Sequence, residues 1–160
     1  MAGEPAVLVV TGRDRRARVS VSAAFAVQGL SFASVISQVP VFRDKFGLDE
    51  TQLTITLAAV PVVAGVGSVL AGVLAPRIGS APVLRVATVG VAAMAAVTGL
   101  IDQLSLFYVA VALFGLFIGA VDASMNAQGA AVQRRYGRSL LASCHAWWSV
   151  AGIAAPAAPR

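Results

Sequence analysis

The stretch LSLFYVAVALFGLFIGAVDASMNAQGAAVQRRYGR, from Leu104 to Arg138, decides the fold. The run from Gln103 to Val121 carries no charge, and a helix needs roughly 20 apolar residues to cross a bilayer core. One acid, Asp122, follows this run, and the stretch ends in a cluster of arginines. An acid within a membrane helix is costly in lipid, so it normally faces a protein interior or an aqueous cavity. Asp122 therefore predicts neighbouring helices, which the rest of the chain supplies.

The composition is that of an integral membrane protein. The 160 residues are 58% hydrophobic and 12% charged, with a mean hydropathy of +0.83, whereas a soluble domain has about a quarter of its residues charged. The net charge of +5 comes from basic residues at the ends of apolar runs, without interleaved aromatic residues, so we expect no nucleic-acid partner. The one cysteine, Cys144, excludes an internal disulfide and a redox or zinc thiol pair, and no cofactor is indicated.

The apolar runs predict an all-α membrane protein with about five transmembrane helices. A cytoplasmic tail is expected over residues 1–18, and the expected spans cover residues 19–41, 51–75, 83–101, 104–128 and 140–155. Five spans leave one helix without its pair, and the last apolar run continues almost to the final residue. We therefore expect the amino-terminal part of a longer transporter, with residues 156–160 as a truncated end. The alternative is a complete small membrane protein.

The lysines and arginines predict the orientation. Four arginines lie in the tail, two flank the turn between the second and third spans, and three follow the fourth span. These all share one side of the membrane if the tail is cytoplasmic, and Arg43 and Lys45 then lie opposite. This is the positive-inside pattern. It predicts a multi-pass protein of the cell membrane with a cytoplasmic N-terminus.

Polar residues in the first span share one helical face. Gln28, Ser31 and Gln38 follow one another at spacings of three and seven residues. Two glutamines on one stripe are unfavourable against lipid, so this face is expected to turn toward the bundle. Two readings stay open: interhelical hydrogen bonds, or contact with a substrate.

The fourth span places small residues on one face with an acid and an amide. Gly115, Gly119, Asp122 and Asn126 lie at spacings of four, three and four residues. Asp122 is a candidate proton or substrate site, and one half of a structural ion pair is the alternative. Asn126 is a candidate hydrogen-bonding group. The two glycines are expected to form a helix-packing seam.

Three further residues are candidates for packing or proton transfer. Gly65 and Ser68 in the second span lie at helical spacing and are expected to pack against a neighbouring helix. His145, the only histidine, is a candidate proton relay or a structural hydrogen-bond donor. No metal site is expected, because zinc takes three or four protein ligands. No Ser–His–acid set stands out by its spacing, so no enzymatic activity is predicted.

The turn between the second and third spans resembles the signature loop of the major facilitator superfamily. The segment Gly72-Val-Leu-Ala-Pro-Arg-Ile-Gly79 is similar to the family's G-x-L-A-D-R-x-G-R-R, with Pro76 in place of the aspartate. Gly72, Arg77 and Gly79 match the loop, which is linked to gating in the family. The resemblance implies the first part of a twelve-helix carrier made of two six-helix halves.

The segment from Val121 to Gly129 resembles the fourth span of the fucose permease branch of this family. The resemblance places Asp122 where that branch has an acid implicated in proton-coupled sugar uptake. It implies a carrier that moves a small polar solute, a sugar being one candidate, by alternating access, with a proton as one candidate coupling ion. Its partners would be the solute, the lipid bilayer and the missing C-terminal half. The rival hypothesis is a non-transporting membrane interaction protein.

Overall fold

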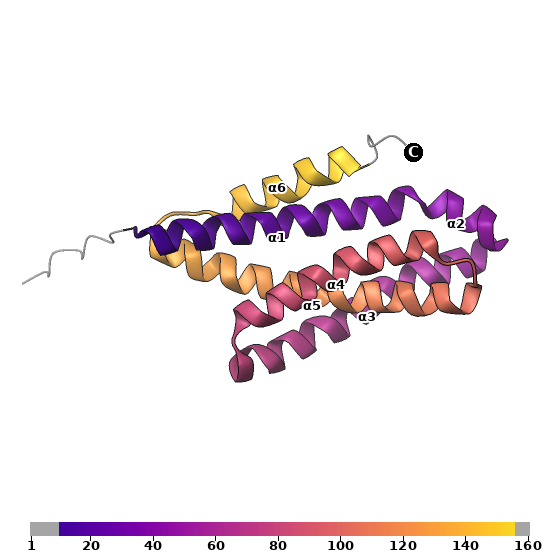
Figure 1. Cartoon of the computed structure of the whole chain (residues 1–160), viewed down its shortest axis with the longest axis horizontal. Coiled ribbons are helices and arrows are strands. Elements are labelled where there is room, and N and C mark those ends of the chain that lie inside the picture. The colour runs from indigo at the N-terminus through magenta and orange to yellow at the C-terminus, as the bar shows by residue number, and fades with distance from the viewer. Residues whose placement is uncertain (1–9, 156–160) are drawn as a thin grey trace, which may run out of the picture.

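The computed structural model describes residues 10–155, and six helices follow one another in this part of the chain. They are α1 (Gly12–Ser37), α2 (Val39–Phe46), α3 (Glu50–Ile78), α4 (Ser80–Leu100), α5 (Leu104–Tyr136) and α6 (Leu141–Ala154). The long helices form an elongated bundle, with α6 alongside α1 and α2 at one end (Figure 1). We call the end where α1 begins and α5 ends the arginine end. The predicted all-α fold is confirmed.

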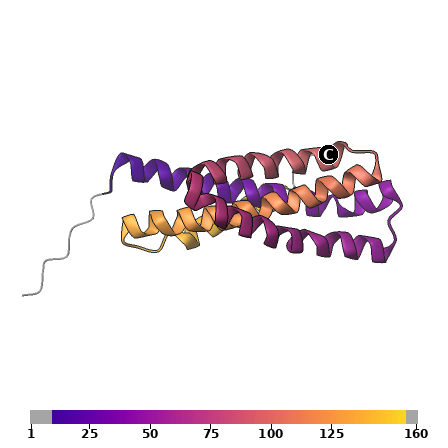
Figure 2. The same cartoon turned by 90° about the horizontal axis from the view of Figure 1, so that it is seen from below.

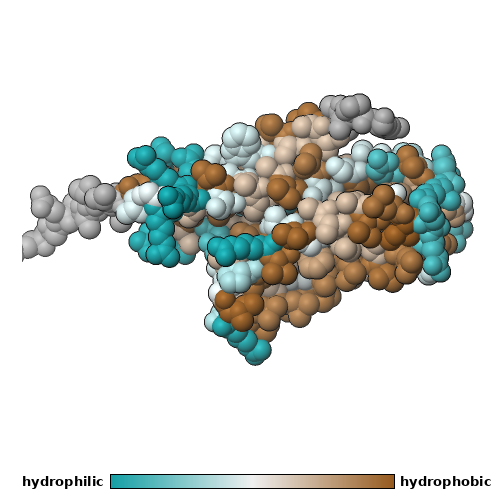
Figure 3. Space-filling model, viewed as in Figure 1, coloured by the Kyte–Doolittle hydropathy of each residue, from teal (hydrophilic) through white to brown (hydrophobic). Residues whose placement is uncertain are grey.

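Four helices, α1, α3, α4 and α5, are long and apolar enough to cross a membrane. Large apolar side chains point outward along them; Val62 and Val69 of α3 are 71% and 67% exposed. Figure 3 shows hydrophobic residues over the middle of the bundle and hydrophilic residues mainly at its ends. A water-soluble monomer rarely exposes so large an apolar surface, whereas a bilayer covers it. Figure 2 shows the same helices from below, with the bundle's long axis retained.

The first helix begins earlier than the apolar pattern predicts. The pattern ends the tail at Arg18, but α1 starts at Gly12. The backbone N–H of Thr11 donates to Asp14 Oδ2 at 2.9 Å, and the Asp14 N–H donates to Thr11 Oγ1 at 3.3 Å. This capping box satisfies two N–H groups that the first turn leaves without helical partners. The helix therefore extends into the part of the tail that the structure describes, and residues 1–9 lie outside it.

A short helix replaces the loop expected after the first span. Helix α1 ends at Ser37, and α2 begins at Val39 with Pro40 in its first turn. Phe42 and Phe46 of α2 pack on Phe107 of α5, with ring centroids 5.0 and 4.6 Å apart. These aromatic contacts attach α2 to the start of α5.

The third and fifth helices also run further than the expected spans. Helix α3 passes through Pro76 to Ile78, and only Gly79, at φ 90°, separates it from α4. A positive φ of this kind favours glycine. Helix α5 continues past residue 128 to Tyr136, across most of the expected polar loop, and ends at Gly137 with φ 62°. Alanine, glutamine and arginine favour a helix, so the loop begins only where glycine ends it.

Glycines allow the helices to approach closely at two places. A Cβ added at Gly119 of α5 would overlap the carbonyl oxygen of Ala64 in α3, and one at Gly67 of α3 would overlap that of Leu116 in α5. Similarly, a Cβ at Gly29 of α1 would overlap the carbonyl oxygen of Trp148 in α6. Two backbone-to-backbone pairs result, α3 with α5 and α1 with α6. The candidate site lies between these pairs.

Candidate functional site

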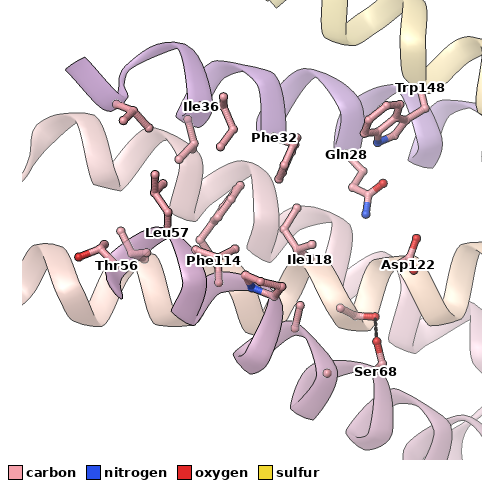
Figure 4. Close-up of a pocket in the computed structure, with 18 of the residues that line it drawn as sticks. Gln28, Phe32, Ile36, Thr56, Leu57, Ser68, Phe114, Ile118, Asp122 and Trp148 are labelled. Carbon is pink, nitrogen blue, oxygen red and sulfur yellow. Dashed lines mark hydrogen bonds between the residues drawn. The ribbon is translucent and has the colours of Figure 1, made fainter. Parts of the chain in front are cut away.

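A cavity of about 710 Å³ lies between α1, α3, α5 and α6 (Figure 4). Its walls are mostly apolar. Its polar lining side chains are Gln28, Thr56, Ser68, Asp122 and His145. Because few polar groups face the cavity, each has a large share in deciding what binds there.

Gln28 and Asp122 come from different helices and point into the same cavity. The Gln28 amide extends from α1 and the Asp122 carboxylate from α5, as Figure 4 shows. Gln28 is only 5% exposed, whereas Asp122 is exposed at the cavity surface. Among residues 10–155, no basic side chain lies within ion-pair distance of Asp122. Its carboxylate therefore remains available to a solute or a proton.

Asn126 bonds to Asp122. Its Nδ2 donates to the Asp122 backbone oxygen at 2.9 Å and to Asp122 Oδ1 at 3.3 Å. Asn126 does not line the cavity. The spacing of four residues brings the two side chains to one helical face, and there the amide holds the carboxylate.

Ser31 and Gln38 do not join Gln28 in the cavity wall. Ser31 is 6% exposed and buried among the helices. Gln38 is exposed and forms the cap between α1 and α2, where its N–H donates to Val35 O at 3.1 Å. The helical stripe predicted from the sequence is interrupted because α1 ends before Gln38.

His145 and Trp148 of α6 complete the polar part of the wall. The His145 ring meets the Phe25 ring edge-on, with centroids 4.9 Å apart. Trp148 lies beside Gln28 in Figure 4, and its ring centroid is 6.3 Å from that of Phe32. The chemistry available at this end of the cavity is thus an amide, a carboxylate, an imidazole and an indole.

The signature-loop residues lie at the surface, where α3 meets α4. Arg77 is exposed in the last turn of α3. The Gly79 N–H donates to Ala75 O at 2.9 Å, which closes that helix. A Cβ at Gly72 would meet no heavy atom within 4 Å. These residues are separate from the cavity.

The predicted packing residues have different surroundings. A Cβ at Gly115 would lie 2.9 Å from Val60 O, and Ser68 Oγ donates to Gly119 O at 3.0 Å. Gly65 differs, because a Cβ there would meet nothing within 4 Å, and it lines the cavity instead. The close contact on α3 belongs to Gly67, which the sequence pattern did not single out.

Sequence reasoning also missed most of the apolar wall. On α1, Phe32 and Ile36 follow Gln28 at two successive spacings of four residues, and both line the cavity. On α3, Pro61 and Gly65 line it at a spacing of four. Extending the helical period from Gln28 would have found the residues on α1. The polar lining residues of α3, Thr56 and Ser68, are twelve residues apart and only apolar residues lie between them, so no polar stripe marks that face.

The profile of the Major Facilitator Superfamily matches residues 4–156. The chain belongs to this superfamily. This match covers nearly all of the 160 residues, and it confirms the family that the signature loop resembled. The chain is therefore a multi-pass membrane protein of a transporter superfamily.

Two curated relatives are themselves named as transporters. A protein of Sinorhizobium fredii, named an uncharacterised transporter, is 26% identical over 133 residues, which is 83% of this chain and 35% of the relative. A protein of Yersinia pestis, named an uncharacterised MFS-type transporter, is 29% identical over 140 residues, 85% of this chain and 35% of the relative. The chain thus spans about a third of the length of these relatives. No solved structure matches it significantly.

Proposed function

We propose that this superfamily member forms one wall of the solute path in a carrier that moves a small polar solute across the cell membrane by alternating access. The observation that carries the proposal is the facing pair Gln28 and Asp122 in a cavity whose walls are otherwise mostly apolar. Neither group is paired with an opposite charge among the described residues, so both are able to bind a solute. The remaining helices of the carrier would supply the opposite wall.

The solute class follows from the groups gathered at one end of the cavity. The Gln28 amide can donate and accept hydrogen bonds, and the Asp122 carboxylate accepts them. Trp148 adds a flat aromatic surface beside Gln28. A ring that carries hydroxyl groups could hydrogen-bond to the amide and the carboxylate and stack on the indole. A sugar is therefore the candidate that we favour. The likeness of the segment around Asp122 to the fucose permease branch supports the same choice.

A proton is the proposed coupling ion. Asp122 is exposed at the cavity surface and has no basic partner among the described residues, so it is free to exchange a proton with water. His145 lines the same cavity and can relay a proton between water and the carboxylate. The charge distribution supports a cytoplasmic N-terminus, which would place Asp122 in the cytoplasmic half of the membrane.

The substitution Asp122→Asn tests this function. We expect it to lower the uptake of labelled neutral monosaccharides, driven by an inward proton gradient, by about tenfold or more. The reason is that the variant lacks the carboxylate that accepts and releases the proton. Uptake is measured in membrane vesicles from cells that express the complete open reading frame containing this chain.

Asp102→Asn is the matched control. This acid lies outside the cavity, 90% exposed, and pairs with Lys45 at 2.8 Å. The same acid-to-amide change should leave uptake nearly unchanged there, since an exposed ion pair contributes little. Sugar uptake by the Asp122→Asn vesicles that still responds normally to the proton gradient would contradict the proposal.

A further inference from the structure

A second groove, of about 840 Å³, lies at the arginine end, between the first turns of α1, the end of α5 and the start of α6. It shares no lining residue with the cavity that holds Asp122. Arg15, Arg18 and Arg138 line it together with Tyr136 and Trp147. The transport proposal makes no use of these residues.

The three guanidinium groups are available to an anion. The Arg18 and Arg138 guanidinium carbons lie 5.7 and 6.0 Å from the centroid of the Tyr136 ring, so both charges lie beside the same ring. Among residues 10–155, no carboxylate lies within ion-pair distance of any of the three arginines. The nearby acid Asp14 is engaged in the cap with Thr11. The groove thus has concentrated positive charge that the described part of the chain does not neutralise.

An apolar wall continues from this charge toward the middle of the bundle. Val19, Ala23 and Ala26 of α1 line it, with Val19 68% exposed. From Arg18 to Ala26 the helix rises about 12 Å. Trp147 of α6, 55% exposed, forms the facing wall. Positive charge at the mouth of the groove and an apolar surface below it match a molecule with an anionic head and a hydrocarbon tail.

We propose that this groove binds an anionic phospholipid from the surrounding leaflet. The phosphate accepts hydrogen bonds from Arg18 and Arg138, and one acyl chain lies along Val19 and Trp147. Guanidinium groups bind phosphate through paired, charge-assisted hydrogen bonds. Basic pockets between membrane helices at the cytoplasmic side bind lipid head groups in this way. The site is independent of the transport proposal and holds whatever the solute is.

Trp147 reports on occupancy of the groove. The chain has two tryptophans, so Trp148→Phe leaves Trp147 as the only one. The purified chain is placed in phosphatidylcholine bilayers at about 0.15 M salt, where charges beyond roughly 8 Å are screened. Brominated phosphatidylglycerol or brominated phosphatidylcholine is then added, and quenching of Trp147 fluorescence is measured. We expect brominated phosphatidylglycerol to reach half-maximal quenching at a mole fraction at least about fivefold lower than brominated phosphatidylcholine does.

Two double substitutions distinguish a specific lipid site from general electrostatic attraction between the arginines and anionic lipid. Arg18→Gln with Arg138→Gln should remove most of the preference, whereas Arg134→Gln with Arg135→Gln, which removes equal charge from exposed positions outside the groove, should change it less than about twofold. Helix content measured by circular dichroism must be the same as in the unsubstituted chain, which shows that each variant is folded. Equal quenching by both lipids, or equal losses in the two double variants, would overturn the proposal. So would loss of phosphatidylglycerol quenching in about 10 mM inorganic phosphate, because the groove would then bind free phosphate.

Discussion

Gly119 illustrates how one atom decides the contact between α3 and α5. An added Cβ would overlap the Ala64 carbonyl oxygen, and the Ser68 hydroxyl donates to the Gly119 oxygen at 3.0 Å. We expect Gly119→Ala to lower the free energy of unfolding by about 1–3 kcal/mol, because the backbones must separate. The measurement is the midpoint of unfolding in mixed micelles with increasing sodium dodecyl sulfate.

The same methyl group at Gly72 is the control, since it would have no heavy atom within 4 Å. There the change should stay within about 0.5 kcal/mol. Equal midpoints for the two variants would show that the close approach does not limit stability.

For single residues, the sequence shows which ones are suited to close helix packing better than it predicts which residues they contact. Small residues on α3 are visible in the sequence, but whether Gly65 or Gly67 meets α5 depends on the rotation of α3 about its axis. That rotation is set by contacts along the whole helix, which no local pattern encodes. Similarly, the spacing places Asn126 on the face of Asp122, and the structure adds that its amide bonds to that residue.

Helix α6 depends on a side chain from another helix for its start. Gln133 Oε1 of α5 accepts from the N–H groups of Leu140 and Leu141 at 3.0 and 3.3 Å. Leu140, the N-cap residue, has no side chain that could do this. We expect Gln133→Ala to raise amide hydrogen exchange over residues 140–144 by about fivefold, the equivalent of one lost cap of about 1 kcal/mol.

Gln103→Ala supplies the comparison for that experiment. Gln103 is the N-cap residue of α5, and its side chain makes no cap hydrogen bond. Exchange at the start of α5 should therefore not change. Identical exchange at residues 140–144 with and without the Gln133 side chain would refute its capping role.

Element by element, hydropathy predicts where helices lie and fails to mark where they end. An uncharged run shows which residues suit lipid, whereas a helix continues into water as long as its residues favour it. The capping box at Thr11 extends α1 backward, and the residues before Gly137 extend α5 forward. Capping and glycine signals were present in the sequence at both ends, but the change from apolar to charged residues concealed them.

For the whole molecule, the distribution of charge predicts the topology. Arginines gather at the end where α1 begins and α5 ends, while Arg43 and Lys45 lie in the last turn of α2, which Figure 1 shows at the opposite end. We expect alkaline phosphatase fused after Gly47 to be active, and fusions after Gly79 or Gly137 to be inactive, because the enzyme folds only outside the cytoplasm. Activity measured in intact bacteria decides the orientation. The reverse activity pattern would place the N-terminus outside.

The glycine contacts bear on how the cavity could change its width. Gly29 brings α1 against α6 and Gly119 brings α5 against α3, so closely that neither contact has room for a Cβ atom. We expect each pair to move as a rigid unit and the boundary between the two pairs, where Gln28 and Asp122 line the cavity, to change more easily. A pivot at that boundary would alter the separation of the amide and the carboxylate while both helix pairs keep their internal contacts.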